Sequence, residues 1–355
     1  MKKIRNSILI LTFASLLMYF FYPFLVPYCE ISSYYWYLDR KDNSDLTNPE
    51  VLVLGDSQII SGIAPETIAE MENINVDSVI YEPRPSEQPE GMLDKYYQLK
   101  KQYPSIRKVY LNISPISVTR NSVTDAHKQL YFSFGKFNIH QLVDGDLRKA
   151  YFSSAYDLIW KWAIEIFPFF GLNGNISSIV SILPSNSQFY DFDSKTNSTL
   201  TKNQSLDIFS SRKNDSAYLK KHWNETGRSW VWKNYGTTKQ EIDDSSVFPK
   251  GSAIGFTRKR EISIRIFRKL IGDAKNSKIA IVCLDLPFSS PLEKDMEDHG
   301  VTLLFEAELA ELKDCRYIRP GRDAFQQKDL FADWTHLNEK GRGVLHQILL
   351  SWKKD

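Results

Sequence analysis

Two short motifs at opposite ends of the chain carry residue types that could perform acyl transfer. Gly55-Asp56-Ser57 directly follows the apolar run 51–54, and Asp333 stands three residues before His336 near the C-terminus. A serine at the end of a strand is exposed where the backbone turns, and an aspartate near a histidine can orient the imidazole that activates it. Each motif alone is common by chance. Together, in this order, they suggest a serine acyl-transfer site.

Each motif also has a plain structural interpretation. Ser57 could cap the helix that follows it, and Asp333 could cap the last helix with His336 on the surface. The longer string Asp-x-x-His-Leu-Asn-x-x-Gly, which ends at Gly341, favours the chemical interpretation. The glycine in it fits close packing of the last helix against the sheet.

The elements that must position these residues form an alternation of strands and helices. The apolar runs predict strands at 51–54, 76–81, 108–113, 279–284 and 317–318, and helical patterns occupy 91–101, 258–274 and 337–352. This alternation is typical of an α/β fold with a parallel sheet. Function collects at the carboxyl ends of the strands in such a sheet, and Ser57 falls at one of these ends.

An unusually long segment separates the third and fourth predicted strands. It spans about 140 residues, far more than an ordinary connection. We interpret residues 118–255 as an insertion in a domain of residues 49–355, forming either a cap over the site or a partner-binding subdomain. A partly disordered surface excursion is the alternative.

The N-terminus has the character of a membrane anchor. Residues 6–29 carry no charge, and Lys2, Lys3 and Arg5 precede them. About 20 apolar residues cross a bilayer, and basic residues stay in the cytoplasm. We therefore expect residues 1–29 to form an uncleaved transmembrane helix that exports the rest of the chain, and residues 30–48 to form a linker. A cleaved signal peptide is the alternative, and no A-x-A pattern supports it.

Several aromatic residues near this segment fit a belt at the outer membrane interface: Tyr19, Tyr22, Tyr28, Tyr34, Tyr35 and Trp36. The net charge of +2 and the scattered basic residues do not favour nucleic acid as a partner. The three cysteines, Cys29, Cys283 and Cys315, form neither a disulfide framework nor a metal pattern. We expect no cofactor and no metal.

The two motifs resemble those of the SGNH/GDSL hydrolase superfamily. The matching blocks are Gly55-Asp56-Ser57 and Asp333-Trp334-Thr335-His336-Leu337-Asn338. The resemblance covers roughly residues 49–117 and 256–352. It implies a flavodoxin-like three-layer sandwich with Ser57 as nucleophile, His336 as general base and Asp333 as the residue that orients the base.

The chain departs from the family where the oxyanion hole should lie. No glycine follows the second strand until Gly91, and Asn112-Ile113-Ser114-Pro115 replaces the family's G-x-N-D after the third strand. We therefore expect Arg84, Asn112 or Ser114 to supply a donor beside the backbone N–H of Ser57. Ser114 aligns best with the family's asparagine. The alternative for Arg84 is an ion pair with Glu82 or Glu87 on a surface loop.

These departures, together with the anchor, look like a membrane-anchored branch that acylates cell-envelope polymers, as in teichoic-acid D-alanylation and alginate O-acetylation. The resemblance implies an acyltransferase or esterase acting on an envelope polysaccharide or lipid-linked polymer, beside a multi-spanning membrane O-acyltransferase. One alternative is a non-catalytic scaffold that binds such an enzyme or polymer. Another is a general secreted lipase or esterase.

Overall fold

The computed structural model describes most of residues 48–175 and 260–352, together with scattered residues between 6 and 36. Short gaps in these ranges fall at 120–121, 313, 328–329, 332–334 and 338. The statements that follow concern these described residues.

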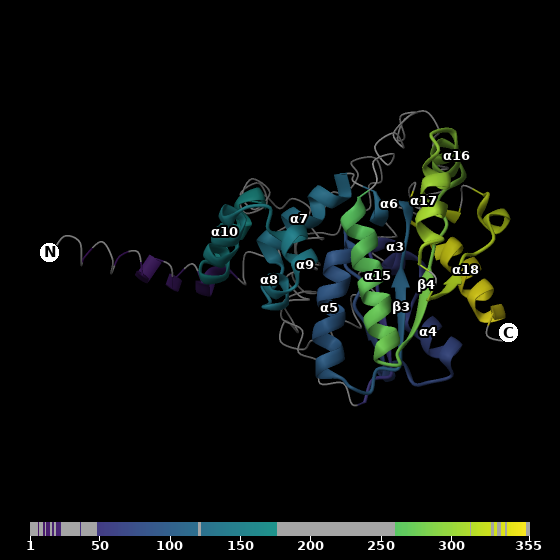
Figure 1. Ribbon diagram of the computed structural model, residues 1–355, viewed down its shortest axis with the longest axis horizontal. Coiled ribbons are helices and arrows are strands. Elements are labelled where there is room, and N and C mark those ends of the chain that lie inside the picture. Colours follow the sequence, from purple (N-terminus) through teal and green to yellow (C-terminus); the bar gives the residue numbers. More distant parts are fainter. Residues whose placement is uncertain are drawn as a thin grey trace, which may run out of the picture.

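A five-stranded parallel sheet forms the centre of the molecule (Figure 1). Its strands are β1 (Val51–Leu54), β2 (Val79–Tyr81), β3 (Lys108–Asn112), β4 (Ala280–Leu284) and β5 (Arg316–Ile318). They lie in the order β2-β1-β3-β4-β5, which is the flavodoxin-like order. The predicted α/β fold with a parallel sheet is confirmed, and each predicted strand is present with ends shifted by at most three residues.

Helices cover both faces of the sheet. One face packs against α5 (Pro89–Gln102) and α15 (Glu261–Asn276). The other packs against α3 (Ser57–Gly62), α4 (Pro65–Glu72) and α18 (Glu339–Ser351). Alternation of side chains along a strand explains the division, because Leu52 and Leu54 enter the first cluster whereas Val51 and Val53 enter the second.

The remaining described elements are further helices that lie between these strands and helices in the sequence. They are η2 (Val76–Ser78), α6 (Pro115–Val118), α7 (Ser122–Phe134), α8 (His140–Val143), α9 (Gly145–Tyr151), α10 (Ala155–Ile166), η3 (Pro168–Asn175), α16 (Ser290–Asp298), α17 (Val301–Leu309) and η6 (Arg322–Phe325).

The first part of the predicted insertion belongs to the same body as the sheet. Helices α8 and α9 pack on α5, and α9 also packs on α15, so this part adds a layer outside the two helices. Arg260 donates its backbone N–H to the carbonyl oxygen of Val118 at 2.9 Å, and its guanidinium binds both carboxylate oxygens of Glu90 at 2.7 and 2.8 Å. The chain therefore leaves and returns at one place. Residues 176–259 lie outside the described residues.

Two aromatic residues assigned to the membrane interface lie instead in the protein core. Tyr22 and Trp36 are both buried in the cluster that contains α5 and α15. The indole of Trp36 donates to the carbonyl oxygen of Pro85 at 2.8 Å and stacks on the guanidinium of Arg84 at 4.3 Å. The expectation of a membrane belt was wrong for these two residues. For Trp36 the reason is that a buried cation and a carbonyl acceptor interact with its indole inside the protein.

The described residues between 6 and 22 are helical. Among the residues that the structure describes, no helix is both long enough and apolar enough to cross a bilayer. Much of the predicted anchor, including Cys29, lies outside the described residues.

Two glycines of α18 allow a test of how tightly the last helix is seated. A Cβ added at Gly341 would lie 2.0 Å from the carbonyl oxygen of Leu330, whereas one added at Gly343 would meet nothing within 4 Å. We expect Gly341→Ala to lower the free energy of unfolding by roughly 1–3 kcal/mol, because backbone must move. We expect Gly343→Ala to be neutral or stabilising by up to about 1 kcal/mol, measured by urea denaturation. Equal effects of the two changes would contradict this packing.

Candidate active site

Ser57 stands at the first position of α3, directly beyond the carboxyl end of β1. A side chain at Gly55 could not fit this turn, because an added Cβ would lie 2.4 Å from Ile59 Cγ1 and 2.9 Å from Asn112 Cβ. Asp56 is the N-cap of α3 and accepts a hydrogen bond from the backbone N–H of Gln58 at 2.8 Å. The glycine and the cap together hold Ser57 at the edge of the sheet. The helix-cap role that Ser57 could have filled belongs to Asp56.

His336 lies beside Ser57, although 279 residues separate them in sequence. Its Nε2 atom is 2.8 Å from Ser57 Oγ, within hydrogen-bond distance. On the other side of the ring, Nδ1 is 3.1 Å from Thr335 Oγ1. A histidine that accepts the serine proton at Nε2 carries its own proton on Nδ1, and Thr335 Oγ1 is able to accept from that N–H. Both His336 and Ser57 are only partly buried, so a substrate can reach them.

The third member of the predicted triad, Asp333, lies outside the described residues. Its orienting role therefore stays a prediction.

Gln58 is a residue of the site that sequence reasoning missed. Its side-chain amide donates to the carbonyl oxygen of Thr335 at 3.3 Å, which links the serine turn to the histidine loop. The other amide atom, Oε1, is buried and has no hydrogen-bond partner in the described part of the chain. Only the fold could reveal this link, since nothing in the sequence pairs residue 58 with residue 335.

The side-chain carboxyl group of Asp56 is buried next to the nucleophile. Burial raises the pKa of Asp56 to about 6, although the backbone N–H of Gln58, the charge of His336 and the side chain of Asn112 each oppose the rise. The Asn112 amide donates to Asp56 Oδ1 at 2.9 Å. Asn112 therefore contacts the residue next to the nucleophile, and its amide is engaged there.

Ser114 is fully buried just beyond the end of β3. Its backbone N–H donates to Ser117 Oγ at 3.0 Å. Its own hydroxyl faces the backbone N–H of Ser117 in a capping box, and its proton has no acceptor among the described residues. A buried hydroxyl whose proton has no acceptor is uncommon and calls for an explanation such as a functional role.

Arg84 forms an ion pair with Glu87, as the alternative prediction stated, but the pair is buried and does not lie on a surface loop. Its Nε atom is hydrogen-bonded to Glu87 Oε2, and both side chains are buried. The Trp36 ring covers its guanidinium. The backbone N–H of Arg84 contacts the serine turn, donating to the carbonyl oxygen of Gly55 at 2.9 Å.

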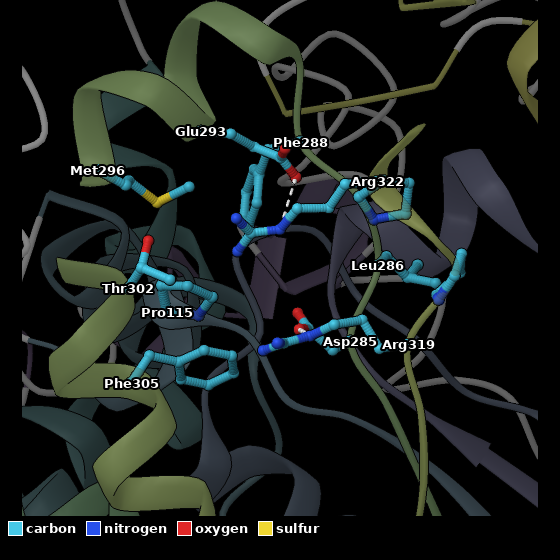
Figure 2. Close-up of a pocket in the computed structure, with 12 residues that line it drawn as sticks. Pro115, Asp285, Leu286, Phe288, Glu293, Met296, Thr302, Phe305, Arg319 and Arg322 are labelled. Carbon is cyan, nitrogen blue, oxygen red and sulfur yellow. Dashed lines mark hydrogen bonds and ion pairs between the residues drawn. The ribbon is translucent and has the colours of Figure 1, made fainter. Parts of the chain in front are cut away.

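A small pocket lies at the carboxyl ends of β4 and β5, on the same edge of the sheet as Ser57 (Figure 2). Its volume is about 20 Å³, enough for roughly one water molecule. Asp285 pairs with Arg319 at 2.6 Å, and Arg322 lies 3.8 Å from Glu293. The charged side chains that line the pocket therefore pair with one another. Burial raises the pKa of Asp285 although Arg319 opposes the rise. This pocket is too small to hold an acyl group without rearrangement.

The chain matches no family model, no curated protein and no solved structure. The described residues contain no cluster of three or more histidine, cysteine, aspartate or glutamate side chains able to hold a metal ion. The geometry of the site is therefore the observation from which a function can be inferred.

The buried carboxyl of Asp56 should make the free energy of unfolding depend on pH. Its pKa in the folded state, about 6, exceeds the ordinary value of 3.8, so the folded state binds more protons between these two values. The stabilisation from the protonated acid is present below about pH 4 and is lost as the pH rises through about 6. Asp56→Asn keeps the helix cap and removes the titration.

We expect the Asp56→Asn variant and the wild type to have similar free energies of unfolding near pH 4. At pH 7 the variant should be more stable, by up to roughly 3 kcal/mol. Denaturant titrations of both proteins at the two pH values measure this difference. A difference that does not change with pH would show that Asp56 titrates normally.

Proposed function

We propose that this protein is a membrane-anchored, exported serine acyltransferase or esterase of the SGNH type. It acts on an envelope polysaccharide or lipid-linked polymer, beside a multi-spanning membrane O-acyltransferase. The observation that carries the chemistry is the 2.8 Å approach of Ser57 Oγ to His336 Nε2 at the carboxyl edge of a parallel sheet. The exported location rests on the uncharged segment 6–29 and the basic residues before it.

In the proposed first half-reaction, His336 Nε2 removes the proton from Ser57 as Oγ attacks the carbonyl carbon of an acyl donor. The tetrahedral intermediate collapses when the donor's leaving group departs with the proton from Nε2. This forms an ester between Ser57 and the acyl group. In the second half, a polymer hydroxyl attacks that ester while Nε2 takes its proton, and Ser57 recovers a proton from Nε2. Water in place of the hydroxyl gives hydrolysis.

We assign the oxyanion hole to the backbone N–H of Ser57 and the hydroxyl of Ser114. Ser114 is favoured because the proton of its buried hydroxyl has no acceptor in the described part of the chain. The Asn112 amide already donates to Asp56, and the Arg84 guanidinium pairs with Glu87. Replacing Arg84 would also leave Glu87 without that cation in a buried position, so it would damage folding and give no clean test of catalysis.

Covalent labelling with a fluorophosphonate probe tests the nucleophile. We expect the wild type to react at one serine, Ser57, and Ser57→Ala to lose all labelling. His336→Gln should slow labelling by at least about 100-fold, because the serine loses its base. Ser61→Ala is the matched control, since Ser61 lies one turn along α3 and its hydroxyl donates to the carbonyl oxygen of Gln58. Labelling that survives in Ser57→Ala, or fails in the folded wild type, would favour the scaffold interpretation.

The same probe tests the oxyanion donor, because phosphonylation also builds negative charge on an oxygen. We expect Ser114→Ala to lower the second-order rate of labelling by about 100-fold or more, with an unchanged melting temperature. Thr119→Val is the control, because Thr119 is also buried and its hydroxyl donates to the carbonyl oxygen of Pro115 at 2.7 Å. An unchanged rate in Ser114→Ala would place the second donor elsewhere.

A further inference from the structure

Helix α10 presents one row of apolar side chains outward, although Ile164 on the same helix is buried. Tyr156 is 69% exposed, Ile159 67%, Trp162 55% and Ile166 60%. The side chain of Lys161, on the same helix, is 0% exposed. A helix on the surface of a protein in water normally has the reverse arrangement, with lysine outside and apolar residues inside.

Hydrogen bonds made by Lys161 hold the helix in this orientation. Its ammonium group donates to the carbonyl oxygens of Tyr131 at 2.9 Å, Phe132 at 3.3 Å and Gly135 at 2.5 Å, at the C-terminal end of α7. A cation is favoured at that end of a helix, where carbonyl groups lack partners. Glu165 adds a second inward contact, accepting from the backbone N–H of Phe137 at 3.0 Å. Turning α10 to bury its apolar row would break all of these bonds.

The outward row continues beyond the helix and remains free of charge. Its four positions on α10 are separated by three or four residues, so they share one face. Phe167 and Phe170 follow, both exposed, and the ring of Phe170 stacks on Trp160 with centroids 5.9 Å apart. The result is an uncharged surface of aliphatic and aromatic side chains, larger than scattered exposed residues would produce.

The N-terminal segment brings a second exposed apolar surface to the same end of the molecule. Ile10, Phe13 and Phe20 are exposed on the described part of its helix. Tyr22, at the end of this part, is buried in the same core cluster against which Leu158 and Trp160 of α10 pack. Figure 1 shows the N-terminal pieces and α10 together at one end, opposite the C-terminus.

We propose that α10 lies in the interfacial layer of a lipid bilayer, next to the point where the N-terminal segment enters it. Tyr156 and Trp162 suit the headgroup level, and Ile159 and Ile166 suit the upper acyl chains. The uncharged row, its mixture of aromatic and aliphatic residues and its continuity with the N-terminal segment favour lipid over a protein partner. The proposal rests on the membrane attachment contained in the proposed function, but not on the chemistry of Ser57.

The test uses the full chain, because Tyr22 and Trp36 belong to the core and truncation would disturb it. Photoreactive benzoylphenylalanine replaces Ile159 in one variant and Ile166 in a second, and each is reconstituted in vesicles of phosphatidylethanolamine and phosphatidylglycerol. Leu303 on α17 is the matched control position, because it is an aliphatic residue that is 73% exposed. We expect lipid adducts at positions 159 and 166 to exceed those at 303 by about tenfold.

Each other outcome has a definite meaning. Equal adducts at all three positions, with the protein in the vesicle fraction, would overturn the placement of α10 while leaving membrane attachment intact. Adducts between two protein chains at position 159 in place of lipid adducts would show a protein interface and would also overturn the proposal. Failure to recover the full chain with the vesicles would refute the anchor itself. None of these outcomes affects the labelling of Ser57.

Discussion

Burial of β1 on both faces is the constraint on which the rest of the structure depends. All four of its residues are essentially inaccessible to solvent, and its neighbours β2 and β3 satisfy its backbone on both edges. A strand held in this way ends at a fixed point. The turn at Gly55 and the cap at Asp56 then place Ser57 at the edge of the sheet, within reach of a loop from the other end of the chain.

A buried group of charged side chains lies behind the site and joins distant segments. Burial lowers the pKa of His127 to about 3, so this ring is neutral, and it lies 3.3 Å from Glu87 and 3.8 Å from Glu90. Burial alone would raise the pKa of Glu90, but the charge and hydrogen bonds of Arg260 outweigh it and lower the pKa to about 2. With Arg84 paired to Glu87, each buried carboxylate has its own cation.

This buried group joins segments of the described chain that are far apart in sequence. Trp36 from the N-terminal region stacks on Arg84 and lies against His127, with ring centroids 5.3 Å apart. Arg260 brings in the segment that returns after the insertion. The same group contacts the serine turn through the backbone of Arg84. Trp36, the described part of the insertion and the candidate site therefore belong to one packed body.

The sequence by itself determined the elements whose signal is local. Apolar runs located the five strands of the sheet, and the turn at Gly55 and the helix beginning after His336 were marked by glycine, capping residues and helical periodicity. The approach of Ser57 to His336 was also predicted from the sequence, because the two motifs resemble a known arrangement of serine and histidine. The prediction for Gly341 was close packing against the sheet, whereas the structure packs this glycine against the backbone of Leu330, outside the strands.

Only the tertiary structure decided the interactions between residues far apart in sequence. Gln58 has no local feature that links it to Thr335. Trp36 is a residue type that is common at membrane interfaces, although its ring is buried against Arg84. The direction in which α10 faces depended on carbonyl groups at the end of another helix. An amphipathic pattern shows that a helix has two faces, but the partner that satisfies Lys161 determines which face lies inside.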